Sequence, residues 1–413
     1  MTFADKYFSR YQSYPQLFDD FAAANLDAIV VIPCYDDIHI FKTLASLRDS
    51  IKEGINVEVI VIINSGMQTS AIIIENNRKI FEELKILETS GGYKFKLLVK
   101  NIENIPKKTA GVGNARKIGM DEAVRRFDSI EKPNGIIISL DADCLVDSNY
   151  LSKIITTFRT KNTTGVVTTQ FKHDFNENLY SNEIIKACKL YEIYLRYFRI
   201  SLRLTGFPYC FHTIGSCFAV TALSYIRVGG MSKRQGGEDF YFLHKLAPMT
   251  EILEIKHQIV FPSPRISDRV PFGTGPSVQN IINTGIYKVY NFKLFFILKE
   301  FYDNIKNLFI DAKTTASKLP HEIIEFIGEK KLLNIIDECK QNTKGSTNFI
   351  KRFYLNFDAF FIIKFLNSFD TNSSYPPQDI VEALGNFFQY TEISIENHEI
   401  NTIYDEIVKL DLK

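Results

Sequence analysis

Residues 28–63 read AIVVIPCYDDIHIFKTLASLRDSIKEGINVEVIVII, in which two short β-branched runs flank a longer and more polar stretch. The runs at 28–33 and 57–63 have the composition of buried strands. Between them, apolar residues recur near helical spacing until Gly54, and glycine commonly ends a helix. The segment therefore predicts one βαβ unit, and with it a parallel sheet covered by helices.

The same alternation continues along the chain. Further β-branched runs lie at 95–99, 135–140, 165–170 and 216–220, and further helical stretches lie at 68–88, 113–127 and 182–204. After the Pro- and Gly-rich segment 261–277 the alternation of β-branched runs with helical stretches ends, and the chain from 280 onward is predicted to be mostly helical. We therefore predict an N-terminal extension at 1–26, an α/β domain at 27–277 and a helical C-terminal region at 278–413.

Composition and charge exclude several classes of protein. Apolar residues make up 45% of the 413 residues and charged residues 23%, as in folded globular chains. The 49 Lys and Arg nearly balance the 48 Asp and Glu, so a net charge of +1 gives no field to attract nucleic acid. The six cysteines lack zinc-site spacing, and we find neither a signal-peptide pattern nor the roughly 20 apolar residues of a membrane span. We therefore expect a cytoplasmic protein without a nucleic-acid partner.

Two carboxylates follow the predicted strand 135–140. Asp141 and Asp143, in the sequence LDADC, leave the carboxyl end of a buried strand, where open α/β sheets bind ligands. Hard oxygen donors at this spacing suit Mg²⁺ or Mn²⁺ with open positions for phosphate oxygens. The alternative is that both acids cap backbone groups in a turn, as Asp often does after a strand.

The strand 28–33 runs into Pro33, Tyr35, Asp36 and Asp37. Tyr35 can stack on a planar base, and either acid can bind a ribose or a base edge. The plainer role for one of the acids is the N-cap of the next helix. The two roles are compatible.

A second candidate segment is 111–117, GVGNARK. Its glycines permit close approach of the backbone, and Arg116 and Lys117 bring positive charge to a predicted helix N-terminus, which suits a diphosphate. The alternative is an ordinary glycine turn before a solvated basic helix. Arg116 stands where the fingerprint G-x-G-x-x-G has its last glycine, so NAD binding is disfavoured.

Two later segments carry further charge. Glu238 and Asp239 follow the glycine-rich loop 229–237 at the start of a predicted helix, where a carboxylate can act as general base on an acceptor hydroxyl or merely complement the helix dipole. Arg265 and Arg269 lie in a Pro- and Gly-rich segment that resembles a loop able to close over a charged ligand. They can neutralise a departing diphosphate, or pair with acids nearby.

Taken in order, these motifs resemble those of the family 2 glycosyltransferases, which have the GT-A fold. The motifs are VIPCYDD (31–37), VIVIINSG (59–66), GVGNARKIG (111–119), LDADC (140–144) and GGED (236–239). The resemblance covers about residues 27–275. It implies a Rossmann-like mixed sheet flanked by helices, a nucleotide-sugar donor, a divalent cation (Mn²⁺ or Mg²⁺) and inversion at the anomeric carbon.

The resemblance also implies roles for individual residues. It makes Asp143 the main metal ligand and places Asp141 at the ribose or the metal, Arg116 by the donor phosphates, Pro33, Tyr35 and Asp37 by the nucleoside, and Asp239 of the Glu238–Asp239 pair as the catalytic base. In the mechanism that we expect, Arg265 or Arg269 helps Arg116 to stabilise the leaving diphosphate, and Gly215 forms part of the floor of the donor-sugar pocket. Where family members commonly read Asp-Asp-Gly-Ser, this chain reads Ile63-Asn64-Ser65-Gly66. The amide of Asn64 can bond a uracil or guanine edge, and we favour a UDP-sugar as donor.

Other features leave alternatives open. The chain has no Trp, so the Gln-x-x-Arg-Trp motif of processive synthases is absent, and we expect a single-addition enzyme or a soluble polymerising one. The acceptor is expected to be a glycan or a lipid-linked acceptor. The C-terminal region can pack internally, form a homodimer or lie against a membrane surface. A sugar-phosphate nucleotidyltransferase would need a Gly- and Lys-rich loop where 31–37 is acidic, and a non-catalytic adaptor with an inactive transferase domain would not need the carboxylates.

Overall fold

A computed structural model describes residues 2–11, 14–161, 163–267, 273–395 and 399–413. The chain forms two compact units. The first comprises 1–180 and 212–276, and the second comprises 181–211 and 277–413. Each unit is described separately below.

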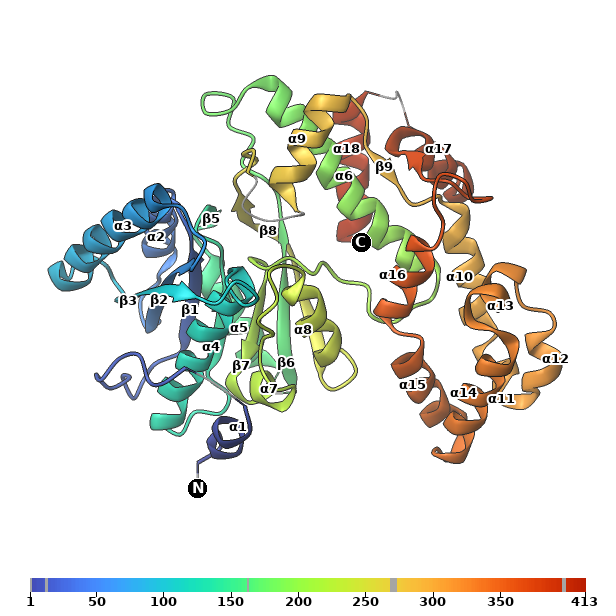
Figure 1. Ribbon diagram of the computed structural model, residues 1–413, viewed down its shortest axis with the longest axis horizontal. Coiled ribbons are helices and arrows are strands. Elements are labelled where there is room, and N and C mark those ends of the chain that lie inside the picture. Colours follow the sequence, from blue (N-terminus) through green and yellow to red (C-terminus); the bar gives the residue numbers. More distant parts are fainter. Residues whose placement is uncertain (1, 12–13, 162, 268–272, 396–398) are drawn as a thin grey trace. The chain divides into compact units, whose positions relative to one another are not determined.

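The first unit is built on one eight-stranded mixed sheet in the order β3-β2-β1-β4-β7-β6-β8-β5 (Figure 1). Its strands are β1 (Ala28–Cys34), β2 (Val57–Gly66), β3 (Lys96–Ile105), β4 (Ile136–Ser139), β5 (Cys144–Val146), β6 (Thr164–Phe171), β7 (Phe218–Thr221) and β8 (Glu251–Pro262). β3, β2, β1 and β4 are parallel, whereas β7 is antiparallel to both β4 and β6. The predicted α/β class with a mixed sheet is confirmed.

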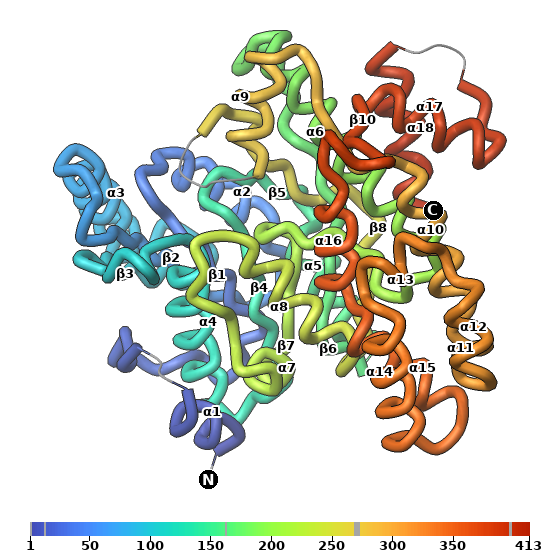
Figure 2. The backbone as a smooth tube through the Cα atoms, turned by 45° about the vertical axis from the view of Figure 1, so that its right-hand side comes forward, coloured from blue at the N-terminus to red at the C-terminus, as the bar shows by residue number. Residues whose placement is uncertain are grey.

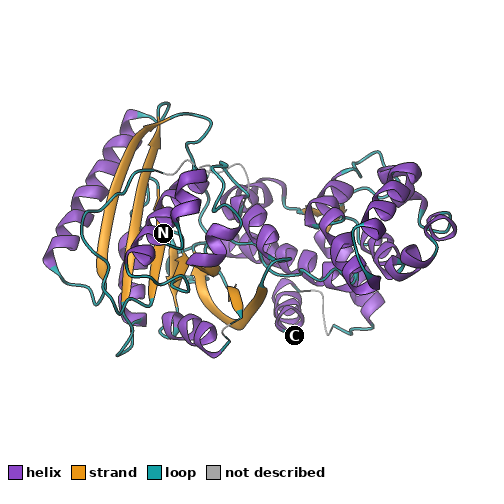
Figure 3. Cartoon of the chain, turned by 90° about the horizontal axis from the view of Figure 1, so that it is seen from below, coloured by secondary structure: helices purple, strands orange, loops and turns teal. Residues whose placement is uncertain are grey.

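Every residue of β1 and β4 is buried. Continuous β-branched runs suit such strands, because both faces of the sheet are covered by helices. Right-handed crossovers put the helices between β1, β2 and β3 on one face and the helix that returns from β3 to β4 on the other. Figure 3 shows helices beside the strands of this sheet. The helices of this unit are α1 (Asp5–Arg10), α2 (Ile40–Ser50), α3 (Ala71–Ser90), α4 (Val112–Ser129), α5 (Tyr150–Thr160), α7 (Ala222–Arg227) and α8 (Glu238–Leu246).

The second unit is mostly helical, as predicted for the chain from 280 onward. Its elements are α6 (Asn182–Leu204), β9 (Lys288–Val289), α10 (Lys293–Asp303), α11 (Ile305–Ile310), α12 (Ala312–Ala316), α13 (His321–Ile327), α14 (Glu329–Gln341), α15 (Gly345–Asn356), α16 (Ala359–Asn367), β10 (Gln378–Asp379), α17 (Ile380–Thr391) and α18 (Ile400–Leu412). Helix α9 (Thr274–Thr284) carries the chain from the first unit into the second.

Helix α6 belongs to the second unit, although it lies within the segment 27–277 that the sequence pattern joins into one domain. The proposed domain limits at 26/27 and 277/278 stay a prediction. Among the helices of the described residues, none is long and apolar enough to cross a membrane.

Candidate active site

The predicted site residues gather at one edge of the sheet because of its strand directions. Asp37 follows β1, Asn64 lies near the end of β2 and Asp141 follows β4, and these strands are parallel, so their carboxyl ends share an edge. The loop after β3 leads to the N-terminus of α4 at the same edge. Gly215 precedes β7, which is antiparallel to β4, and therefore reaches this edge as well.

Arg116 is the central cation of the candidate site. It lies in the first turns of α4, is 4% exposed, and forms ion pairs with Asp141 and Glu238. A buried guanidinium requires such partners because an unpaired charge away from water is costly. Arg116 thereby connects the carboxyl end of β4 to the N-terminus of α8.

Gly215 fits directly against this guanidinium. A Cβ at position 215 would lie 2.2 Å from Nη2 of Arg116. Only a residue without a side chain leaves room for Arg116 in this position, and this close approach explains why a glycine stands beside the predicted sugar pocket.

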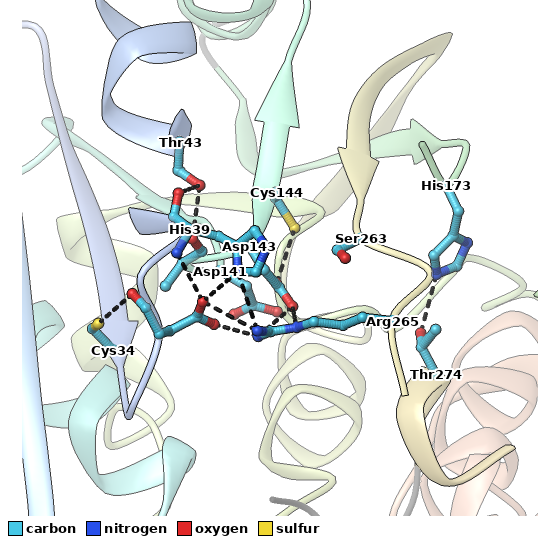
Figure 4. A network of polar contacts seen from close by, with 12 residues as sticks. Cys34, His39, Thr43, Asp141, Asp143, Cys144, His173, Ser263, Arg265 and Thr274 are labelled. Atoms are coloured by element: carbon cyan, nitrogen blue, oxygen red, sulfur yellow. Dashed lines mark hydrogen bonds and ion pairs between the residues drawn. The ribbon is translucent and has the colours of Figure 1, made fainter. Parts of the chain in front are cut away.

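Arg265 forms a second ionic cluster at the same edge. Its Nη2 lies 2.9 Å from Oδ2 of Asp143, and the guanidinium also pairs with Asp37 (Figure 4). His39 accompanies them, with Nδ1 3.1 Å from Oδ1 of Asp37. One guanidinium therefore holds acids from the ends of β1 and β4 together.

The two arginine clusters are joined through the turn that carries Asp141 and Asp143. Thr43 of α2 donates a hydrogen bond of 2.8 Å to the carbonyl of Ala142, which fixes the peptide between the two acids. Both carboxylates keep partial access to solvent, with side chains 32% and 25% exposed. The turn therefore presents one carboxylate to each arginine and leaves both accessible to a ligand.

Burial changes the acidity of two carboxyl groups in this region. Desolvation, followed by the charge of Glu238, raises the pKa of Asp239 to about 7, although Arg116 opposes the shift. Desolvation also raises the pKa of Asp143 to about 6, against the attraction of Arg265. A carboxylate with a pKa near neutrality is suited to accept a proton from an acceptor hydroxyl, and Asp239 meets that requirement.

Glu238 and Asp239 occupy the first turn of α8 but differ in their contacts. Glu238 is 1% exposed and paired with Arg116, whereas Asp239 is partly exposed, and its Oδ1 accepts a hydrogen bond of 2.7 Å from the backbone of Phe240. Glu238 is therefore placed to position Arg116. Of the two acids, Asp239 is the one that keeps some exposure to solvent.

The turn after β1 is held in an unusual conformation. Asp36 has a φ of 48°, a region that residues with a side chain rarely occupy. Two asparagines of α3 hold it, since Asn77 accepts from the Asp36 backbone at 2.8 Å and Asn76 donates to its carboxylate at 2.9 Å. These two positioning residues escaped the sequence analysis. The signal was present, because Asn77 interrupts a buried stripe that continues with Ile80 and Leu84.

The remaining predicted residues have more varied positions. Pro33 is buried within β1, and Tyr35 is partly exposed in the turn that follows. The amide of Asn64 donates a hydrogen bond of 3.1 Å to the carbonyl of Gly111, so it braces the loop before α4. Arg269 lies outside the described residues.

The donor atoms of this edge suit a divalent cation. Asp141 and Asp143 offer hard carboxylate oxygens, and a bound cation would share them with Arg116 and Arg265, which pair with them in this structure. Within the described residues, no group of three or more His, Cys, Asp or Glu side chains is placed to hold a metal. The residues therefore fit a cation that takes its other ligands from phosphate oxygens and water.

A pocket opens beside Asp143 and encloses about 340 Å³, including space open to solvent. It is lined by His39, Lys42, Thr43, Asp143, Leu145, Asp174, Leu179, Tyr180, Phe261 and Ser263. Its charged side chains include Lys42, Asp143 and Asp174, so one of the two metal candidates faces this space.

Residues 29–226 match the model of the family described as glycosyl transferase family 2. This part of the chain is therefore a family 2 glycosyltransferase domain, as the motifs at its strand ends predicted. The mixed sheet flanked by helices agrees with the GT-A fold expected of this family.

Comparison with solved structures gives more distant likenesses. The structure of residues 1–349 of S. aureus TarS is 12% identical over 85% of this chain and 98% of that chain, with a TM-score of 0.39. The mannosyltransferase PcManGT from Pyrobaculum calidifontis, solved with GDP-Man and Mn²⁺, is 13% identical over 99% of this chain and 91% of that chain, with a TM-score of 0.35. M. tuberculosis glucosyl-3-phosphoglycerate synthase is 12% identical over 65% and 86%, with a TM-score of 0.36. No curated protein matches this sequence.

Proposed function

We propose that the protein is an inverting, metal-dependent glycosyltransferase that moves a sugar from a nucleoside-diphosphate donor to an acceptor hydroxyl. One observation supports this most strongly. The ion pairs of Arg116 link Asp141, a metal candidate, to Glu238, whose neighbour Asp239 is the candidate base. The candidate metal ligand, the candidate phosphate-binding cation and the candidate base therefore lie at one edge of the sheet.

The proposed reaction is a direct displacement. Asp239 takes the proton of the acceptor hydroxyl, and the acceptor oxygen attacks the anomeric carbon from the side opposite the diphosphate. The bond between the anomeric carbon and the phosphate oxygen breaks, and its electron pair leaves with the nucleoside diphosphate. Attack from the opposite side inverts the configuration of the sugar.

The costly part of this reaction is the negative charge that develops on the leaving diphosphate. We propose that Arg116 and Arg265, which pair with Asp141 and Asp143 at this edge, offset that charge. A cation held by Asp143 and Asp141 would supply further Lewis-acid stabilisation of the diphosphate when bound.

The donor is proposed to be a UDP-sugar, and the acceptor a glycan or a lipid-linked glycan of polysaccharide or glycoconjugate synthesis. Tyr35 and the turn at Asp36 offer a ring and a fixed backbone for the nucleoside. We also propose a cytoplasmic location for the protein.

The test is a panel of UDP-, GDP- and dTDP-sugars with Mn²⁺, with Mg²⁺ or with chelator. We expect one donor to raise the melting temperature only when metal is present, because a ligand that binds the folded state stabilises it. The same donor should release its nucleoside diphosphate, and NMR of the product should show an inverted anomeric configuration.

Two rival functions predict different results in the same panel. A nucleotidyltransferase would form a nucleotide sugar from a sugar phosphate and a nucleoside triphosphate. An adaptor would neither bind nor cleave any member of the panel. Either result would overturn the proposed function.

A further inference from the structure

Three tyrosines of the N-terminal segment pack against helix α4 and the loop 229–237, which carry or directly precede residues of the candidate site. They are Tyr7, Tyr11 and Tyr14. Tyr7 lies in α1, which runs beside α4 and the turn after α7 (Figure 2). The loop 229–237 joins α7 to α8 and ends directly before Glu238 and Asp239. The three tyrosines contact both this loop and α4, as the following observations show.

Tyr7 completes a buried polar network on α4. Its hydroxyl donates to Oδ1 of Asp121 at 2.7 Å and accepts from Nζ of Lys117 at 2.9 Å. Tyr225 donates to the same carboxylate oxygen at 2.8 Å. All of these side chains are at most 6% exposed, so each depends on the others for its hydrogen bonds. Lys117 directly follows Arg116, and the network therefore fixes the turn of α4 that carries the central cation.

The start of the loop is pressed against two of the tyrosines. A Cβ at Gly230 would lie 2.2 Å from the hydroxyl of Tyr7, and a Cβ at Gly229 would lie 2.9 Å from the ring of Tyr11. Both glycines have positive φ, 72° and 82°. The loop thus turns sharply at the surface that the tyrosines provide.

The end of the loop contacts the third tyrosine and the N-terminus of α4. The amide of Asn114 donates to the Tyr14 hydroxyl at 3.2 Å, and Nζ of Lys233 lies 5.6 Å from the centre of the Tyr14 ring. A Cβ at Gly113 would lie 2.3 Å from the carbonyl of Arg234 and 3.0 Å from Cγ of Glu238. Loop and helix are therefore in backbone contact immediately before the candidate base.

We propose that Tyr7, Tyr11 and Tyr14 form a tyrosine clamp whose role is to hold the loop 229–237 against α4. The clamp thereby positions Glu238 on Arg116 and Asp239 in the cleft. The tyrosines are positioning residues and touch no reacting group. Their role in turnover rests on the proposed function, but their hold on the loop does not.

Limited trypsin digestion tests that hold in the full-length protein, because Lys233 and Arg234 provide cleavage sites inside the loop. The variants are Tyr7→Phe, Tyr14→Phe and Tyr11→Ala, with Tyr93→Ala as the matched control. Tyr93 is also partly buried, but it stacks on Phe95 at 4.8 Å, beside β3. Tyr7→Phe and Tyr14→Phe should each be cut at 233 or 234 about fivefold faster than wild type, since losing one hydrogen bond of about 1 kcal/mol raises the open fraction by that factor. Tyr11→Ala should also be cut faster, because it removes the ring that packs against Gly229.

Mass spectrometry identifies the peptide bond that trypsin cleaves. The melting temperature shows whether a variant opens only the loop 229–237 or destabilises the whole protein. The clamp is supported if cleavage at 233 or 234 accelerates while other sites keep their rates, and if Tyr11→Phe, which retains the ring, restores the wild-type rate. Unchanged cleavage in all three variants, or equal acceleration in Tyr93→Ala, overturns it.

Turnover gives a second readout if the panel above identifies a donor. The clamp variants should lower kcat at unchanged donor KM, because Asp239 is then held less well in the closed protein, while Tyr93→Ala leaves both unchanged. A wild-type protein inactive toward all donors would refute the proposed function without affecting the cleavage result. Faster cleavage at an unchanged kcat would contradict the positioning role.

Discussion

The surroundings of Asp239 change its pKa, and this pKa bears directly on its proposed role as the catalytic base. Burial and the charge of Glu238 raise the pKa of Asp239 to about 7, so its base form accumulates only as the pH rises through that value. We expect kcat/KM to increase from pH 5 to a plateau above about pH 8 with an apparent pKa near 7. Asp239→Asn should remove this rise and lower kcat by about 10²- to 10⁴-fold.

The matched control for Asp239 is Asp19→Asn, a change at an exposed acid of the same unit. It should retain both the rate and the pH profile of the wild type. A wild-type rate in Asp239→Asn would show that another group takes the proton.

Gly215 tests the packing of Arg116. In Gly215→Ala the new methyl group would overlap the guanidinium, whose Nη2 lies 2.2 Å from the Cβ position, so Arg116 must move. We expect a loss of about 1–3 kcal/mol in stability and weaker donor binding. Gly92→Ala is the control, because its nearest neighbour is a flexible Ser90 hydroxyl at 3.8 Å. Thermal unfolding and donor titration of both variants measure the difference, and equal behaviour would contradict the account of Gly215.

The sequence identified Arg116, Glu238 and Asp141 as charged residues near ligands, but it did not reveal that they pair. Arg116 and Glu238 are 122 positions apart, and no local pattern encodes such a contact. The pairing follows from strand directions, which place the start of α4 and the start of α8 at one edge. Local chemistry was therefore predictable, whereas the partner of each charge depended on topology.

At the scale of elements, the segment after β8 carries a cation that competes for the metal candidates. Arg265 lies 2.9 Å from Asp143, and a divalent cation at that carboxylate must displace it. Arg265→Ala should therefore bind Mn²⁺ about two- to fivefold more tightly than wild type in the absence of nucleotide, since partly exposed ion pairs contribute up to about 1 kcal/mol. The same variant should release diphosphate more slowly.

Calorimetric titration with Mn²⁺ measures this effect. Arg159→Ala serves as the control, because Arg159 pairs with Asp27 in an exposed position. Weaker Mn²⁺ binding in Arg265→Ala would mean that Arg265 does not compete for Asp143.

Several elements could be predicted, because the apolar pattern of a buried strand or an amphipathic helix is visible in the local sequence alone. β1, β2, α4 and α6 lie within a few residues of the predicted ranges. β8 escaped prediction, since its charged and polar residues, as in EILEIKHQ, dilute the apolar pattern of a strand that is only partly buried. Its pairing with β6 and β5 supplies the stability that its local sequence does not indicate.

At the scale of the whole chain, the second unit is fastened by an ionic network between its first and last helices. Asp411 of α18 is 1% exposed and lies 3.0 Å from Nη1 of Arg199 in α6. Nearby, the hydroxyl of Tyr404 donates a hydrogen bond of 2.7 Å to Glu192, and Glu192 forms an ion pair of 2.8 Å with Arg196. Helix α18 is therefore integral to the second unit.

Asp411→Asn should destabilise the protein by about 3–5 kcal/mol, because it leaves buried arginine charge without its carboxylate. Asp405→Asn on the same helix is exposed and should change stability by no more than about 0.5 kcal/mol. Denaturant unfolding of both variants makes the comparison, and equal midpoints would show that α18 contributes little. The sequence predicted helices in this region but not that α6 packs with them. An amphipathic pattern shows that one face of a helix is buried, but it does not show which element covers that face.

The central claim is that one edge of the sheet holds both the metal-binding acids and the base. Its most direct test is the rate of nucleoside diphosphate release from the stabilising nucleotide sugar, with Mn²⁺, in wild type, Asp143→Asn and Asp239→Asn. We expect both variants to lose at least about 10²-fold in rate, with Asp143→Asn also losing metal-dependent donor binding and Asp239→Asn retaining it. Wild-type rates in both variants would contradict the claim.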